Sequence, residues 1–207
     1  MIKNRIDAGK KIARALLKYK GRDAVVYAIP RGGVVVGRIV ADELGLPLDL
    51  VVTRKLVQPG NADVAFGAVD EAGSRMIDEA ELAKIDPALA EEEIQKQTEE
   101  VARRAKLFRA GKEPMLSTGK VAIIVDDGIT TGYNIRPAVQ YLKSQNPKKV
   151  VVAIPVAPRQ SLEAVRSMVD EIVTLIPPET FGTSVDEHYA DFAQPSDQDV
   201  IDVFLGK

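Results

Sequence analysis

The chain has 207 residues, of which 45% are hydrophobic and 28% are charged, enough for one α/β domain with a buried core. Its 28 basic and 30 acidic side chains give a formal charge of −2, so no overall basic field attracts nucleic acid or an anionic membrane. The absence of cysteine excludes disulfides and a cysteine nucleophile, and a single histidine, His188, argues against a zinc centre. Neither an N-terminal leader nor an apolar run of about 20 residues is found, so we expect a cytoplasmic protein.

The first part of the chain predicts two helices that alternate with two strands. Apolar residues at helical spacing favour helices over 7–20 and from Val36 to Leu44, the second ended by a glycine. Short apolar runs at 24–29 and 48–53 are typical of strands buried on both faces of a parallel sheet. The weakly periodic, glycine-rich residues 56–75 then predict a long flexible loop, within which a β-ribbon can form.

The second part continues the alternation. Asp86 and Pro87 open a long helix, whose late basic residues up to Arg109 are expected on a solvated face that complements the helix dipole. Further strands are predicted at 121–125, 150–154 and 171–176, and further helices at 131–144 and 159–168. This order predicts an α/β fold of right-handed βαβ units, with a central parallel sheet flanked by helices.

Residues after 176 differ from the rest, because prolines, glycines and polar residues replace the apolar periodicity. They predict a small cap beside the sheet or a plain C-terminal extension. We therefore expect a single domain over 1–207, with its core at about 7–176 and the cap at about 177–207.

The segment from Val121 to Asn134 carries the clearest chemical signal. A buried strand ends in two adjacent carboxylates, Asp126 and Asp127, and a turn of small residues leads into the next predicted helix. In open α/β sheets ligands bind at this edge, and backbone N–H groups at a helix start form an anion pocket with nearby hydroxyls. Carboxylates beside such a pocket suit a phosphorylated sugar with vicinal hydroxyls and a bound magnesium ion.

Spacing disfavours three other kinds of phosphate site. The P-loop pattern GxxxxGK[ST] is absent, and residues 30–34 do not supply the GxGxxG of a dinucleotide-binding unit. Gly128 stands where a phosphatase with an aspartyl nucleophile needs its second aspartate. The remaining alternative is an ordinary turn rich in Asp, Gly and Thr.

The segment resembles the signature with which type I phosphoribosyltransferases bind 5-phosphoribosyl-1-pyrophosphate (PRPP). The likeness is to a phosphoribosyltransferase-like subfamily in particular, and it extends through residues 29–33, 54–56 and 181–189. It implies the type I phosphoribosyltransferase fold, with a small C-terminal cap, or hood, and a long flexible loop that closes over the site.

The resemblance also implies roles for individual residues. Asp126 and Asp127 would be catalytic and would face the ribose hydroxyls and the magnesium ion, directly or through water. The residues implied for the 5-phosphate are Thr130, Thr131, Gly132, Tyr133 and Asn134. Those implied for the pyrophosphate are Arg31, Gly32, Gly33, Arg54 and Lys55, of which Lys55 would also be catalytic. In the cap, Phe181, His188 and Tyr189 would bind the base, with packing of the cap as their alternative role.

The implied reaction transfers the 5-phosphoribosyl group from PRPP to a nitrogenous base and releases pyrophosphate, with Mg²⁺ as cofactor, in nucleotide metabolism. Thr130 stands where 6-oxopurine enzymes carry a carboxylate, which disfavours hypoxanthine and guanine as acceptors. The alternative is a regulatory protein that binds PRPP or a nucleotide without turnover. The expected partners are these small molecules, with no nucleic acid and no membrane, and a homodimer is left open.

Overall fold

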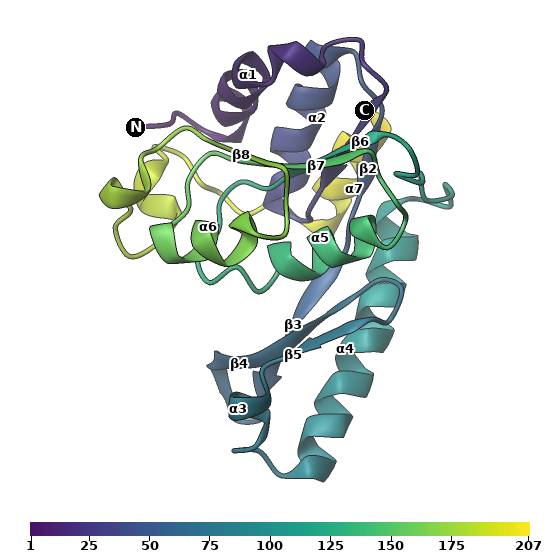
Figure 1. The fold of residues 1–207 in the computed structure, drawn as a ribbon, viewed down its shortest axis with the longest axis vertical. Coiled ribbons are helices and arrows are strands. Elements are labelled where there is room, and N and C mark those ends of the chain that lie inside the picture. Colours follow the sequence, from purple (N-terminus) through teal and green to yellow (C-terminus); the bar gives the residue numbers. More distant parts are fainter.

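The computed structural model describes residues 1–207 and has a five-stranded parallel sheet at its centre (Figure 1). Its strand order is β2-β1-β6-β7-β8, and every neighbouring pair runs parallel. The strands are β1 (Ala24–Ala28), β2 (Leu48–Leu50), β6 (Val121–Val125), β7 (Lys149–Ile154) and β8 (Glu171–Thr174). The predicted sheet is confirmed, although β2 ends at Leu50 rather than at residue 53.

Helices cover both faces of this sheet. On one face lie α1 (Arg5–Ala15) and α2 (Gly32–Leu44), and on the other lie α5 (Ile135–Lys143) and α6 (Arg159–Arg166) (Figure 1). Successive side chains of a strand point to opposite faces, so Val26 packs in one core layer and its neighbour Tyr27 in the other. Burial on both faces explains why the central strands are continuous apolar runs. None of the helices is both long and apolar enough to cross a membrane.

The glycine-rich residues after β2 form strands, where the sequence predicted a flexible loop. They make a three-stranded antiparallel sheet of β3 (Thr53–Gln58), β4 (Asn61–Asp70) and β5 (Arg75–Ile77). The short helix α3 (Glu79–Leu82) and the long helix α4 (Pro87–Phe108) follow, and together these elements form a lobe that projects from the central sheet (Figure 1). The prediction of a flexible loop over 56–75 is therefore wrong, although the β-ribbon allowed within it is present.

Glycines in this lobe mark turns and a close strand contact. Gly60 and Gly73 both have φ of 82° and lie in the turns between its strands. A Cβ on Gly67 would lie 2.5 Å from the carbonyl oxygen of Met76 on the neighbouring strand. The apolar periodicity is weak because only the second half of β4, around Phe66, is buried against α4.

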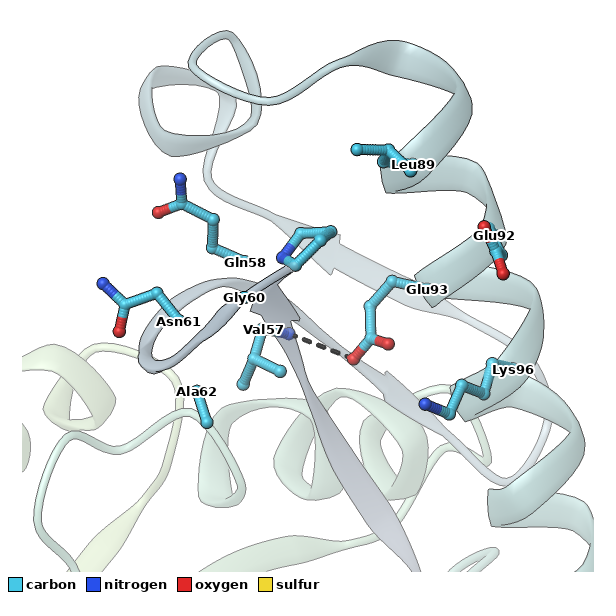
Figure 2. Close-up of a pocket in the computed structure, with 10 residues that line it drawn as sticks. Val57, Gln58, Gly60, Asn61, Ala62, Leu89, Glu92, Glu93 and Lys96 are labelled. Atoms are coloured by element: carbon cyan, nitrogen blue, oxygen red, sulfur yellow. Dashed lines mark hydrogen bonds between the residues drawn. The ribbon is translucent and has the colours of Figure 1, made fainter.

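A groove of about 410 Å³ lies between the β3–β4 turn and α4 (Figure 2). Glu93 of α4 accepts hydrogen bonds from the Val57 N–H (3.4 Å) and the Gln97 side chain (3.1 Å). The β3–β4 ladder is irregular at Val57, so Glu93 supplies an acceptor that the neighbouring strand does not. The groove is at the far end of the lobe and includes none of the predicted site residues.

Helix α4 begins and ends as the sequence predicted, but the residue at its end, Arg109, is not exposed to solvent. The Asp86 side chain caps it, and Pro87 is its first residue. Arg109, by contrast, is only 3% exposed and donates to the carboxylates of Asp49 (2.9 Å) and Glu71 (3.0 Å). Its expected place on a solvated face is therefore wrong. Because Asp49 lies in β2 and Glu71 directly follows β4, Arg109 ties α4 to both sheets.

The first part of the C-terminal segment pairs with the N-terminus. The Ile2 N–H donates to the His188 carbonyl (2.9 Å), and the Ala190 N–H donates to the Ile2 carbonyl (2.8 Å). The regular structure of residues 177–195 consists of two short 3₁₀ turns, Pro178–Thr180 and Asp186–His188. The predicted cap therefore exists as an irregular segment fixed to the start of the chain.

The last helix, α7 (Asp197–Leu205), was missed in the sequence. It packs beside α2 and α4 and contributes Val200 and Phe204 to the core (Figure 1). The cap, predicted over 177–207, therefore ends before α7, and α7 itself belongs to the core. The missed signal is the capping box of Ser196 and Asp199 directly before an apolar run.

Candidate functional site

Strand β6 delivers Asp126 and Asp127 to the carboxyl-terminal edge of the central sheet. Asp126 is 9% exposed, and burial, with the negative charge of Asp127 beside it, raises the pKa of Asp126 well above its ordinary value. One oxygen of Asp126 accepts the backbone N–H of Asp127 at 2.8 Å. The two carboxylates predicted to act together therefore lie together, at the edge where open α/β sheets bind ligands.

Asp127 is held by residues from both ends of the chain. The Nε of Arg5 donates to an oxygen of Asp127 at 2.7 Å, and the hydroxyl of Tyr189 donates to the Asp127 backbone carbonyl at 2.6 Å. Tyr189 is 6% exposed, so it serves to hold the acidic pair. Arg5 was not singled out in the sequence, because it is one of several basic residues in an amphipathic helix.

The loop after the two aspartates wraps a small cavity of about 50 Å³. Its lining residues are Lys55, Asp126, Gly128, Ile129, Thr130, Thr131, Gly132, Tyr133, Asn134 and Ile135. All five residues predicted for the 5-phosphate therefore surround one cavity. The side chain of Thr53 and the buried Ser161 fasten this loop, since each donates to one of its carbonyls, that of Asn134 (3.1 Å) or that of Thr130.

The backbone of this loop offers unpaired donors. The N–H groups of Thr130, Thr131, Gly132 and Tyr133 donate to no backbone carbonyl. Helix α5 begins only at Ile135, not at residue 131 as predicted, so these amides lie in the loop directly ahead of the helix. Successive unpaired N–H groups ahead of a helix attract anions.

The turn between β1 and α2 lies against the acidic pair. A Cβ on Gly32 would lie 1.8 Å from an Asp127 carboxylate oxygen, and a Cβ on Gly33 would lie 2.8 Å from an Asp126 oxygen. No side chain fits in either position, so glycine is required by the close approach. The peptide bond between Pro30 and Arg31, which precedes the glycines, is cis.

Of the three basic residues predicted for the pyrophosphate, only Lys55 lines the cavity. Burial lowers the pKa of Lys55. Arg54, its neighbour in β3, donates to Gln97 of α4 at 2.9 Å, because adjacent strand residues point to opposite faces. Arg31 lies 3.8 Å from Asp197 at the start of α7. The structure thus separates the pair Arg54 and Lys55 and gives Arg31 an acidic partner.

The cap residues predicted for the base take different positions. The rings of Phe181 and His188 stack with their centroids 5.5 Å apart, and both side chains are partly exposed. Val185, which was not predicted, packs on Gly128, where a Cβ would lie 2.3 Å from its side chain. The cap therefore lies directly on the turn that follows the two aspartates.

The acidic pair is not a metal cage by itself. No group of three or more His, Cys, Asp or Glu side chains that could hold a metal ion occurs in the structure. One oxygen of each aspartate is engaged, with Arg5 or with the backbone, and the other is left for a ligand. Two carboxylates in this state fit a magnesium ion that arrives with ligand phosphates, since magnesium in proteins commonly keeps one or two carboxylates and takes its other ligands from phosphate and water.

Comparisons with known proteins agree with this geometry. The family described as "Phosphoribosyl transferase domain" matches residues 1–191. A curated protein of Mycobacterium tuberculosis H37Rv, named provisionally as a phosphoribosyl transferase, is 38% identical over 200 residues, which are 96% of this chain and 45% of the relative. The chain thus spans less than half the length of that relative.

Solved structures agree as well. The crystal structure of TT1426 from Thermus thermophilus has a TM-score of 0.83 and 35% identity, over 99% of this chain and 98% of that one. An adenine phosphoribosyltransferase of Leishmania donovani, at a TM-score of 0.50 and 12% identity over 88% and 69% of the chains, is similar in fold alone. The fold is that of the type I phosphoribosyltransferases, and the chain belongs to the phosphoribosyl transferase domain family.

Proposed function

We propose that the protein binds PRPP with Mg²⁺ and transfers its 5-phosphoribosyl group to a ring nitrogen of a base, with release of pyrophosphate. One observation carries this proposal: unpaired backbone amides of residues 130–133 lie beside the paired carboxylates of Asp126 and Asp127. An anion pocket and two carboxylates are complementary to a ligand that carries both phosphate and a sugar diol.

In this proposal the loop holds the 5-phosphate. The amides of Thr130, Thr131, Gly132 and Tyr133 would donate to its oxygens, with the threonine hydroxyls and the Asn134 side chain as further donors. The start of α5 adds the positive end of its dipole. Asp126 and Asp127 would accept hydrogen bonds from the ribose hydroxyls through their uncommitted oxygens.

The chemical step requires stabilisation of the leaving group. The bond between ribose C1 and the pyrophosphate oxygen breaks with its electron pair going to pyrophosphate, a bond from C1 to the base nitrogen forms, and that nitrogen loses its proton to water. Lys55 and the backbone at Gly32 and Gly33 would stabilise the charge that develops on pyrophosphate. Mg²⁺, held by Asp126, Asp127 and the ligand oxygens, would supply further charge neutralisation. Arg31 would bind the pyrophosphate only after its ion pair with Asp197 is broken.

The acceptor base would lie under the cap, where Phe181 and His188 offer flat, partly exposed rings. A heterocycle stacks on such rings through offset contact of the two π systems. A panel of purine and pyrimidine bases, each tested for PRPP-dependent pyrophosphate release, would identify the acceptor. Binding of PRPP without release on any base would support the regulatory alternative.

The binding part is tested by calorimetry with PRPP and Mg²⁺. The double variant Asp126→Asn with Asp127→Asn is expected to lose measurable binding, because amide side chains supply neither the negative charge nor both acceptors. Its melting temperature is expected to fall, because Asp127→Asn leaves the buried Arg5 guanidinium without its carboxylate partner, and removal of the costly buried charge of Asp126 offsets only part of that loss. The matched control is Asp23→Asn with Asp63→Asn, two exposed aspartates, which should bind as before. Equal affinity in both double variants would refute the proposed site.

A further inference from the structure

Arg5 is buried beneath the candidate site although it belongs to the first turn of a surface helix. Its side chain is 6% exposed, and its guanidinium lies 3.9 Å from the centre of the Phe192 ring. Nε donates to Asp127 and Nη1 donates to the Ala193 carbonyl, both at 2.7 Å. Nη2 is buried without any hydrogen-bond partner. One guanidinium thus connects the acidic pair with the cap.

The ion pair also lies against the turn that begins α2. A Cβ on Gly32 would lie 2.7 Å from Arg5 Nε and 1.8 Å from the Asp127 carboxylate. Arg5, Asp127 and Gly32 are therefore in mutual contact, at the place where the proposed ribose and pyrophosphate sites meet. Any change in the Asp127 rotamer would alter the space available to both.

A role in stability alone does not account for Arg5. A buried ion pair is commonly no more stabilising than apolar side chains of similar volume, and an unpaired buried donor adds a further cost. Cap and core could be joined here by apolar contacts, as they are between Val185 and Gly128. The positive charge of Arg5 is explained by a need to keep the Asp127 carboxylate in one position.

That need arises from the proposed ligand. Asp126 and Asp127 are adjacent carboxylates, and PRPP carries several negative charges of its own, so an unbalanced pair would repel the ligand. Arg5 offsets one of the two charges and fixes one oxygen of Asp127, which directs the other oxygen. Because Arg5 is buried, it exposes no N–H group that could compete with the ligand hydroxyls for the second oxygen of Asp127.

We propose that Arg5 is a positioning residue, which holds the Asp127 carboxylate in the orientation that binds the ligand hydroxyls and does not itself touch the ligand. The inference rests on the proposed binding of PRPP. It assigns to the N-terminal helix a part in a site that is otherwise built from the sheet edge, the loop after β6 and the cap.

The test is a double-mutant cycle between Arg5 and Asp127, measured by calorimetry with PRPP and Mg²⁺ and by thermal melting. Arg5→Met should weaken PRPP binding by about 10- to 100-fold, the range for losing a charged hydrogen bond. Arg5→Lys should recover most of the affinity, because it keeps the charge and one contact. In a protein that already carries Asp127→Asn, Arg5→Met should weaken binding by less than about threefold further.

Two further variants separate positioning from stability. Phe192→Leu removes the ring beside the guanidinium. It should lower the melting temperature without weakening PRPP binding. Arg38 is another helical arginine, which forms an ion pair with Asp42 outside the site. Arg38→Met should change neither the melting temperature nor the affinity for PRPP. If Arg5→Met fails to fold, Arg5→Gln, which keeps a hydrogen bond to Asp127 without the charge, takes its place in the cycle.

The outcomes are distinct. Unchanged affinity in the Arg5 variants, or effects of Arg5→Met and Asp127→Asn that multiply as independent changes, would overturn the positioning role while PRPP binding itself stands. Failure of the unaltered protein and of Arg38→Met to bind PRPP would instead overturn the proposed function, and the inference with it.

Discussion

Gly32 and Gly33 set how closely the turn after β1 approaches the two aspartates. Both lie at the start of α2 with ordinary helical backbone, so glycine is needed there for space and not for an unusual φ. The family resemblance implies that these glycines bind the pyrophosphate. The structure adds that they already give room to the carboxylates themselves, before any ligand is considered.

Gly32→Ala is accordingly expected to displace the Asp127 carboxylate and to reduce PRPP affinity by at least about tenfold, the cost of one misplaced charged hydrogen bond. Calorimetry measures this directly. Gly111→Ala is the matched control: its φ of 83° makes alanine strained, yet no atom lies within 4 Å of the added Cβ. It should lower the melting temperature and leave PRPP affinity unchanged, and a similar loss of affinity in both variants would contradict this account.

The residues of the candidate site differ in how well the sequence predicted them. Asp126, Asp127 and the following loop are contiguous, so a strand that ends at the sheet edge is enough to bring them together. Arg5 and Ser161 reach the site from distant helices, and nothing in their local sequence indicates it. Their contribution depends on how α1 and α6 pack on the sheet, which periodicity alone does not define.

At the scale of elements, β3 shows how a strand divides two adjacent basic residues. Arg54 and Lys55 were predicted to act together because they are neighbours in the chain. In β3 they point to opposite faces, one toward α4 and one into the cavity. The strand was predicted to end at residue 53, after which a loop could have turned both side chains the same way, whereas β3 runs from Thr53 to Gln58.

This division gives a paired test. Lys55→Met should weaken PRPP binding by about 10- to 100-fold, because a half-buried ammonium proposed to lie next to a phosphate is lost. Arg54→Met, a neighbour of the same charge, should alter affinity by less than about threefold. Calorimetry on the two variants compares them, and a larger effect from Arg54 would show that the lobe rearranges when the ligand binds.

Helix α5 illustrates a boundary that sequence could not define. The prediction began this helix at residue 131, directly after the turn of small residues. Gly132 has φ of 78° and interrupts the helical backbone, so regular structure starts at Ile135. The later start places residues 131–134 in the loop that wraps the cavity instead of in the first turn of the helix.

At the scale of the whole molecule, the lobe of β3, β4, β5, α3 and α4 replaces the flexible lid expected from the family. Its strands are paired, and Phe66, Val69 and Leu56 are fully buried against α4. Arg109, directly after α4, fastens the lobe to β2 of the central sheet. Motion of this segment would have to be motion of a folded lobe.

Amide hydrogen exchange distinguishes a folded lobe from a flexible lid. In the absence of ligand, the paired amides of β3 and β4 should exchange slowly, since opening them exposes buried apolar side chains. Residues 130–133 provide an internal reference, because their unpaired amides should exchange quickly and should slow on addition of PRPP and Mg²⁺. Exchange in the lobe as fast as in this loop would show that the strands are not stable on their own.

The contact between Arg5 and Ala193 joins positions 188 residues apart, and it bears on the order in which the protein can assemble during synthesis. Domains form while the chain emerges from the N-terminal end, so β1, β6 and their helices can come together well before the tail is available. Until residues 189–193 leave the ribosome, Asp127 lacks the Tyr189 hydroxyl and Arg5 lacks one of its acceptors. Ligand binding at this edge would therefore be acquired only after residues 189–193 have left the ribosome, later than the sheet that carries the two aspartates.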